Sequence, residues 1–217
     1  MGSIFSTDFK RPTPEIIDEA RSISTSSLHE AAGKIGSLPS ALKPLNSSLG
    51  LCGPAFTVRG APGDNLWLHY ALAEARQGDI LVADMSGFYE AGYWGEVMSI
   101  SAQSRGIAGL VINGCVRDGR AMIEMGFPVF SRGTCMRGTE KNPEFKGALA
   151  ESLPIGDVIV EAGDLVVGDF DGVVVIPHDK IKEVVALAKK RDARELEMMK
   201  DLRKGMTTLE INGWEVK

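Results

Sequence analysis

One arginine and one aspartate follow an apolar run in a position that suits metal or acid–base chemistry. The run IAGLVI (107–112) leads directly into NGCVRDG (113–119), so Arg117 and Asp118 come just after an expected buried strand. In parallel α/β sheets, ligands gather at the carboxyl ends of the strands. A guanidinium is a rigid two-pronged donor for a carboxylate, and an aspartate beside it can hold a hard divalent cation. The same pair also fits an ordinary surface turn that starts a helix.

Two further loops end in polar residues that could reach a ligand. In YWGEVMS (93–99), Gly95 precedes an expected helix, so the backbone N–H groups that follow it can face an anion. Glu96 lies in the first turn of that helix, where an acid can also simply complement the helix dipole. In GDN (63–65), Asn65 opens another expected helix, and it either binds a ligand or caps its own helix. Both alternatives stay open at each position.

Other chemistries lack the residues they need. Lysine is absent between Lys43 and Lys141, the stretch that holds every candidate loop, which argues against a Schiff-base aldolase. The histidines at positions 29, 69 and 178 have no metal-ligand spacing. No dinucleotide-binding, Walker or serine-hydrolase motif occurs, and no glycine-rich loop suits a methyl donor.

Short apolar strands that alternate with helices must position these residues. The apolar spacing predicts helices and strands in turn, with helices over 13–34, 66–76, 95–105 and 119–125, and strands over 51–59, 80–83, 107–112 and 127–131. This alternation indicates an α/β domain with largely parallel strands. From Pro154 onward, Gly-Asp and Asp-Gly turns between short apolar runs predict β-hairpins. A charged helix is expected over 179–204, either packed on its own domain or forming an arm that reaches a neighbouring subunit.

Composition narrows the class of protein. The 217 residues suit one domain, with its core over about 20–178. The net charge of −5, without a basic run, disfavours nucleic-acid binding. Three cysteines without a C-x-x-C pair argue against a disulfide framework. No segment approaches the ~20 apolar residues of a membrane span. We therefore expect a cytoplasmic protein with neither nucleic acid nor membrane as its partner.

Taken in order, these motifs resemble those of the RraA-like family. That family contains class II pyruvate aldolases acting on 4-hydroxy-4-methyl-2-oxoglutarate or 4-carboxy-4-hydroxy-2-oxoadipate, and RraA-type regulators of ribonuclease E. Twenty residues separate Glu96 from Arg117, an acid-x20-R-D arrangement. The similarity extends over about residues 20–190 and includes GDN (63–65), QGDILV (77–82), SRGIAGLVINGCVRD (104–118), FPVFSRGT (127–134) and GDLVVGDFDGVVVIP (163–177). Their occurrence in order is more specific than any one motif.

The resemblance implies a fold, an assembly and a reaction. The fold would be a compact α/β domain of the swivelling β/β/α type, assembled as a homotrimer or homohexamer with active sites between subunits. Mg²⁺ or Mn²⁺ would serve a carbon–carbon lyase that cleaves a 4-hydroxy-2-oxo acid through a metal-stabilised enolate and releases pyruvate. Oxaloacetate decarboxylation would accompany it, because loss of CO₂ gives the same enolate. An acid near the C-terminus of a neighbouring subunit assists some aldolases, and Glu195 and Glu197 both qualify here.

The family pattern also assigns roles to single positions. Asp118 matches the metal-binding aspartate, and Arg117 matches the arginine that contacts the 2-oxo acid during catalysis. Glu96, the third catalytic position, matches the acid that precedes x20-R-D and holds the metal through water. The family often has aspartate there, so the longer side chain leaves a direct contact open. The residues that would complete substrate binding are Asn65, Gly95, Val97 and Met98.

A non-catalytic module that binds ribonuclease E is the main alternative. RraA-type regulators can retain the x20-R-D elements, so the motif alone does not decide between the two functions. The aromatic loop containing Phe88, Tyr89, Tyr93 and Trp94 either walls a substrate pocket or belongs to ordinary core packing. Turnover of oxaloacetate with and without EDTA would separate catalysis from regulation.

Overall fold

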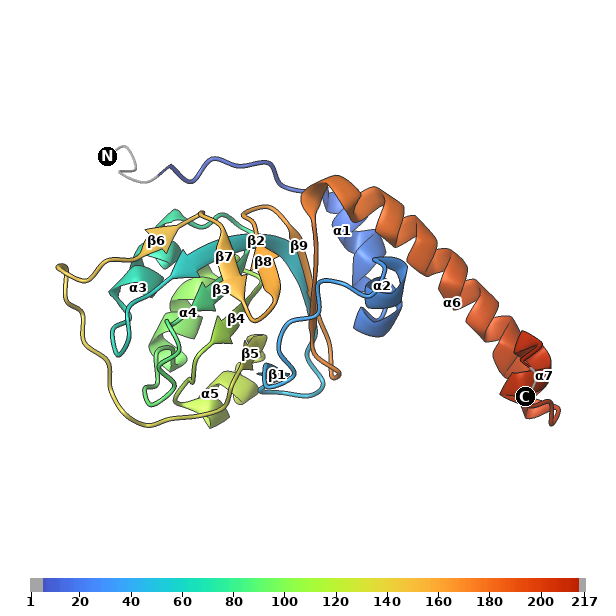
Figure 1. The fold of residues 1–217 in the computed structure, drawn as a ribbon. Coiled ribbons are helices and arrows are strands. Elements are labelled where there is room, and N and C mark those ends of the chain that lie inside the picture. The colour runs from blue at the N-terminus through green and yellow to red at the C-terminus, as the bar shows by residue number, and fades with distance from the viewer. Residues whose placement is uncertain (1–5, 215–217) are drawn as a thin grey trace.

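A central sheet with four parallel strands organises the chain (Figure 1). The computed structural model describes residues 6–214. The parallel strands β2 (Leu51–Arg59), β3 (Ile80–Asp84), β4 (Gly109–Asn113) and β5 (Val129–Ser131) lie in the order β5-β4-β3-β2. The predicted α/β class with parallel pairing is confirmed. Because the strands are parallel, the loops that follow them emerge at one edge.

Antiparallel strands extend this sheet and cover part of it. β9 (Leu165–Gly168) pairs with β2 and β10 (Val173–Ile176) with β9, while β1 (Lys43–Pro44) pairs with β5 and β6 (Ala148–Leu149) with β2. β7 (Leu153–Ile155) and β8 (Val158–Val160) form a separate antiparallel pair. The β7–β8 and β9–β10 pairs confirm the prediction of β-hairpins from Pro154 onward. The short strands β1 and β6 lie in segments that no apolar run marked.

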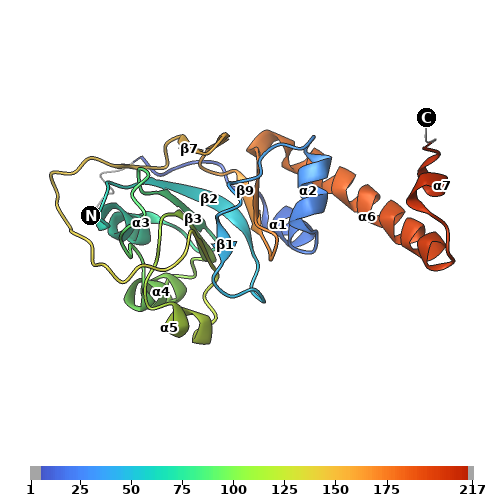
Figure 2. The same ribbon diagram turned by 60° about the horizontal axis from the view of Figure 1, so that its bottom comes forward.

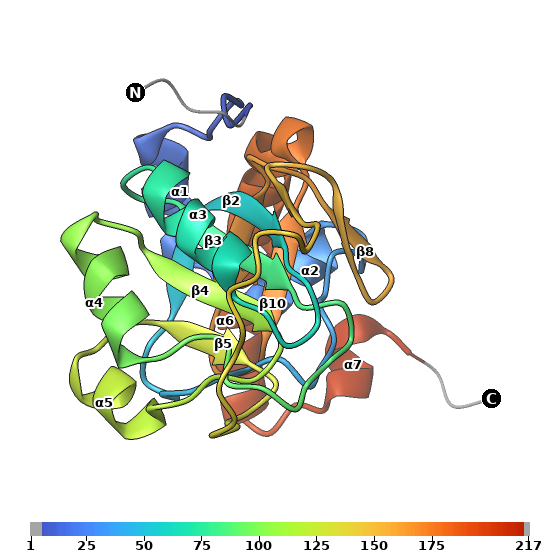
Figure 3. The same cartoon turned by 90° about the vertical axis from the view of Figure 1, so that its left-hand side faces the viewer.

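Alternating side chains along the parallel strands fill two cores, as strand geometry requires. Leu81 and Leu110 face the core beneath α3 (Leu66–Glu74), α4 (Glu96–Ser104) and α5 (Gly119–Glu124). Ile80 and Val111 face the opposite core, which includes residues of the β7–β8 hairpin. Figure 3 shows these three helices on one side of the strands. Both faces of the central strands are therefore buried, and only their ends are free to form a site.

The N-terminal helical segment is two helices, so the prediction of one stretch over 13–34 is wrong. α1 (Pro14–Arg21) ends at Ser22, and α2 (Thr25–Ala31) begins after Ser24. The Ser24 hydroxyl accepts a hydrogen bond from the Ser27 N–H at 3.2 Å and starts the second helix. Helical spacing of apolar residues continues across the break, which is why periodicity alone did not reveal it.

The long C-terminal helix forms an arm, as Figure 2 shows. A short 3₁₀ turn, η1 (His178–Lys180), leads into α6 (Ile181–Arg203), whose first half packs on α1 and α2. Its second half extends beyond the body of the molecule and carries α7 (Thr208–Asn212) at its end. Packing on its own domain therefore describes the first half of the helix, and contact of the second half with a neighbouring subunit stays a prediction. No helix among residues 6–214 combines the length and apolarity needed to cross a bilayer.

Candidate functional site

Backbone hydrogen bonds tie together the loops that leave the parallel strands. The Tyr93 N–H donates to the Cys115 carbonyl at 3.0 Å, and the Arg117 N–H donates to the Trp94 carbonyl at 2.8 Å. The Cys135 N–H donates to the Val116 carbonyl at 2.8 Å, which brings the loop after β5 beside them. The loops after β3, β4 and β5 therefore form one platform, and the side chains that they carry are placed by backbone pairing.

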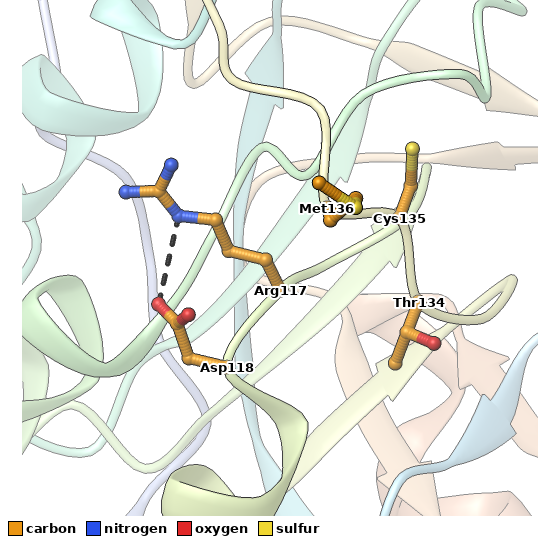
Figure 4. A pocket seen from close by; sticks show the side chains of 5 residues that line it. All are labelled: Arg117, Asp118, Thr134, Cys135 and Met136. Atoms are coloured by element: carbon orange, nitrogen blue, oxygen red, sulfur yellow. Dashed lines mark ion pairs between the residues drawn. The ribbon is translucent and has the colours of Figure 1, made fainter.

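The side chains of Arg117 and Asp118 extend from this platform toward solvent. Their closest atoms, Arg117 Nε and Asp118 Oδ2, are 3.5 Å apart, and the side chains are 49% and 44% exposed. Figure 4 shows the two side chains turned toward each other, with Thr134, Cys135 and Met136 lining the hollow beside them. Asp118 has a left-handed backbone with φ of 55°, a conformation that costs free energy outside glycine and often occurs at functional sites.

Gly95 makes room for the Asp118 carboxylate. Its φ of −155° is extended backbone that any residue can adopt, so conformational freedom is not the reason for a glycine. A Cβ at this position would collide with Asp118 Oδ2 and press on the Arg117 side chain. The Glu96 N–H, at the start of α4, points at the same oxygen from 3.4 Å. The start of α4 therefore faces an anionic group of the chain itself, the Asp118 carboxylate, and binding of an anionic ligand there stays a prediction.

Asn65 does not cap its own helix. Its side-chain N–H group donates to the Tyr93 carbonyl at 2.9 Å and contacts Met98 Sδ at 3.6 Å. The capping bond to the Leu66 N–H comes from Asp64 at 2.8 Å. Asn65 is 6% exposed, and its Oδ1 atom is buried without a hydrogen-bond partner. Because a buried acceptor without a partner is costly, Asn65 Oδ1 is suited to receive a hydrogen bond from a ligand.

A cavity of about 250 Å³ joins these features. Its walls include six of the predicted site residues, which are Asn65, Gly95, Val97, Met98, Arg117 and Asp118. Glu96 is not among the lining residues, and only its backbone N–H is in contact with Asp118. The structure thus gathers the predicted positions around one space, while the chemical roles assigned to them remain predictions. Tyr93 and Trp94 line the same cavity and are fully buried, so they serve both as pocket wall and as core.

Two residues that the sequence did not single out also line this cavity. His69 lies one helical turn after Asn65 on α3, and the i to i+4 spacing could have indicated that they share a face. Lys141 comes from the long loop between β5 and β6. Burial lowers the pKa of His69, the positive charge of Lys141 lowers it further, and Asp64 acts in the opposite direction. No local sequence signal indicated that Lys141 lies near the site.

The donor set suits a hydrated magnesium or manganese ion better than an enclosed metal centre. No group of three or more histidine, cysteine, aspartate or glutamate side chains gathers to hold a metal within residues 6–214. Mg²⁺ commonly keeps several waters and takes only one or two protein carboxylates together with substrate oxygens. The half-exposed Asp118 beside an open cavity fits that mode. Glu96 is exposed next to it and could hold a coordinated water.

Comparisons with known proteins identify the family. The model of the RraA-like family, described as Aldolase/RraA, matches residues 13–175, and the chain belongs to that family. A protein of Halalkalibacterium halodurans named "Putative 4-hydroxy-4-methyl-2-oxoglutarate aldolase" is 38% identical over 179 residues, which cover 82% of this chain and 84% of that protein. The predicted family is thereby confirmed.

Two solved structures have closely similar folds. An uncharacterised protein from Pseudomonas syringae matches with a TM-score of 0.82 and 28% identity, covering 95% of this chain and 96% of the other. RraAS2 of Streptomyces coelicolor, described as an unusual member of the RNase ES inhibitor RraA family, matches with a TM-score of 0.78 and 27% identity, covering 88% and 99%. The similarity therefore extends to both an aldolase by name and a regulator by name.

Proposed function

We propose that this protein is a divalent-metal-dependent carbon–carbon lyase that cleaves a 4-hydroxy-2-oxo acid, releases pyruvate and decarboxylates oxaloacetate. The observation that carries the proposal is the single cavity lined by Arg117, Asp118, the start of α4 and the unpartnered Oδ1 atom of Asn65. A regulatory surface has no need of a buried acceptor without a partner. The name of the 38% identical relative supports the same reaction class.

Asp118, with Glu96 through water, would hold Mg²⁺ or Mn²⁺, which when bound would polarise the 2-oxo group of the substrate. Arg117 can donate two hydrogen bonds and places a positive charge beside the C2 oxygen. As the C3–C4 bond breaks, its electron pair moves toward C2 and negative charge grows on that oxygen. Arg117 stabilises this charge more than the ground state, and that difference lowers the barrier.

The protons must also be accounted for in the cleavage. The C4 hydroxyl loses its proton as C4 becomes a carbonyl, and C3 gains a proton when the pyruvate enolate becomes pyruvate. We assign to Glu96 the water that takes up the first proton, because Glu96 is an exposed acid next to Asp118. Oxaloacetate loses CO₂ from the same position on the carbon chain, so the same groups would serve its decarboxylation.

Purified protein incubated with Mg²⁺ and oxaloacetate tests the proposal, with pyruvate measured over the rate of buffer and metal alone. Removal of the metal with EDTA should abolish the enzymatic rate. Arg117→Ala should lower kcat by roughly 10²–10³, the scale of one lost donor to a developing oxyanion, and Asp118→Ala should be at least as damaging. Arg120→Ala is the matched control, because this arginine is 93% exposed and pairs only with Glu124. If both Arg117→Ala and Asp118→Ala turn over oxaloacetate like the parent, the proposal is wrong.

A second copy of the chain would complete the site. Two apolar side chains near Arg117 and Asp118 are exposed, Val97 of the cavity at 78% and Met136 of the neighbouring hollow at 92%. Burial of both against another subunit would remove this apolar surface from water. We propose a homotrimer or homohexamer with the active site between subunits. Sedimentation of Met136→Asp, which should shift the protein toward smaller species, tests this arrangement.

A regulator that binds a ribonuclease is the second candidate, and the similarity to RraAS2 favours it. That function requires an exposed surface but no metal and no Arg117. A protein that binds ribonuclease E and shows no metal-dependent turnover of oxaloacetate would establish the regulator in place of the lyase.

A further inference from the structure

Two groups of polar side chains line the cavity, and the proposed lyase reaction uses only one of them. Arg117 and Asp118 come from the loop after β4, whereas His69 comes from α3 and Thr139 and Lys141 come from the β5–β6 loop. At about 250 Å³ the cavity is smaller than the roughly 300–1,000 Å³ of drug-sized ligand sites. A small acid of a few carbons that enters it would therefore be within reach of both groups.

Hydrogen bonds of the two adjacent residues hold the backbone of Lys141 in place. The Glu140 N–H donates to the Gly63 carbonyl at 2.8 Å, and the Glu140 carbonyl accepts from the Asn65 N–H at 3.1 Å. On the other side, the Asn142 N–H donates to Asp64 Oδ2 at 2.6 Å. The backbone of Lys141 is thus fixed on both sides against the start of α3, so its side chain extends from a fixed position beside the cavity.

His69 offers a second polar group of the same set. Its Nε2 atom is buried and has no hydrogen-bond partner. His69 and Lys141 line the same cavity, and burial together with the positive charge of Lys141 lowers the pKa of the ring. The nearby Asp64 carboxylate already accepts the Leu66 and Asn142 N–H groups. A ring nitrogen and an ammonium that face one space are a donor set for an anion.

Four other arginines have partners elsewhere in the structure. Arg59 pairs with Glu151, Arg105 donates to the Ala73 carbonyl, Arg120 pairs with Glu124, and Arg132 donates to Asn113. Arg117 and Lys141 are the arginine and lysine residues that line the cavity within the described part of the chain. One positive group for each end of a ligand is what a dicarboxylic acid requires.

We propose that Lys141 and His69 determine specificity by binding the distal carboxylate of a dicarboxylic 2-oxo acid, while Arg117 binds its 2-oxo acid end. This inference rests on the proposed function and adds the residues that select the substrate. Asn65, at the N-cap position of α3, lines the same cavity, and its Oδ1 atom would accept a hydrogen bond from a hydroxyl group of the substrate.

Calorimetric titration of the Mg²⁺-loaded protein with two acids tests the inference. Pyruvate offers only the 2-oxo acid end that Arg117 binds, whereas 2-oxoglutarate adds a distal carboxylate and lacks the C4 hydroxyl that cleavage needs. The parent should bind 2-oxoglutarate more tightly than pyruvate. Lys141→Met should weaken 2-oxoglutarate binding by about tenfold to a hundredfold, the range for a hydrogen bond to a charged group, and leave pyruvate binding unchanged. His69→Gln should act in the same direction, and Lys141→Arg should restore most of the affinity.

Lys146→Met is the matched control, because Lys146 lies on the same loop and is exposed outside the cavity. It should bind both acids like the parent. If Lys141→Met weakens both acids equally, or if the parent binds them equally, the specificity assignment is overturned and the lyase proposal stands. If the parent binds neither acid, both are overturned. Because Lys141 is exposed, its substitution does not threaten the fold.

Discussion

Two arginine–aspartate pairs lie at opposite ends of the central strands. At the amino end of β3, Asp79 is fully buried and forms a two-pronged ion pair with Arg11, with N–O distances of 2.7 and 2.8 Å. The Arg76 N–H adds a third bond to Asp79 at 2.8 Å. At the carboxyl end of β4, Arg117 and Asp118 make one contact of 3.5 Å and are about half exposed.

The difference separates a pair that stabilises the fold from a pair whose charges remain available for the proposed chemistry. The oxygens of Asp79 are occupied by protein donors, so it has nothing left to offer a ligand. Asp118 accepts only from Arg117 and from the distant Glu96 N–H within the described residues, and Gly95 keeps space open beside it. The same two residue types therefore serve to anchor the N-terminal segment in one place and to present unsatisfied charge in the other.

The largest effect on folding should come from the buried pair. Asp79→Ala leaves the Arg11 charge, only 17% exposed, without its partner, and should lower the free energy of unfolding by about 3–5 kcal/mol. Urea unfolding followed by circular dichroism measures this change. Asp8→Ala is the control, since Asp8 pairs with Arg76 at 3.2 Å on the surface with 90% exposure, where a pair contributes about 0–1 kcal/mol. A similar small loss for Asp79→Ala would contradict the structural role.

The metal affinity of the open pair should depend on Gly95. In Gly95→Ala the added methyl group would displace the Asp118 carboxylate, and we expect Mn²⁺ to bind about tenfold to a hundredfold more weakly, as when an orienting partner of a metal ligand is lost. Titration of Mn²⁺ by electron paramagnetic resonance measures the affinity. Gly138→Ala is the control, because a Cβ there meets nothing within 4 Å. Equal affinities in the two variants would show that Asp118 does not hold the metal.

The sequence indicated the elements that surround the site but left open which of two neighbouring polar residues performs which role. Strand ends and helix starts followed from apolar runs and turn residues, so the position of Arg117 and Asp118 at the carboxyl end of β4 could be predicted. The roles of Asp64 and Asn65 could not, because both residues can cap a helix. The Asn65 side chain donates to the Tyr93 carbonyl, 28 residues away in the chain, and is therefore not available to cap α3.

Lys141 illustrates a second limit. The absence of lysine between Lys43 and Lys141 argues against a Schiff-base mechanism only if the β5–β6 loop lies away from the site. Backbone pairing of Glu140 with Gly63 and Asn65 brings the loop there. Such pairing leaves no periodic pattern in the sequence, whereas His69 could have been found from its i+4 spacing to Asn65.

A smaller effect sharpens the contrast between the two pairs. Arg117→Ala should change the free energy of unfolding by no more than about 1 kcal/mol, because a half-exposed ion pair contributes little to stability. The same urea experiment measures it beside Asp79→Ala. A loss as large as that of the buried pair would mean that Arg117 is needed for folding, and its effect on turnover would then not report on catalysis.

The smallest expected effect is a change in how stability depends on pH. Burial, and then the charge of Lys141, lowers the pKa of His69 below its ordinary 6.5, so the folded state favours the neutral ring. The unfolded chain therefore binds a proton more readily, and the stability that the neutral ring contributes is complete above pH 6.5 and is lost as the pH falls through 6.5 toward the folded pKa. In His69→Gln the loss of stability on acidification should be shallower over this window, as unfolding midpoints at several pH values would reveal. An unchanged slope in His69→Gln would mean that the ring takes up its proton equally well in the folded and unfolded chain.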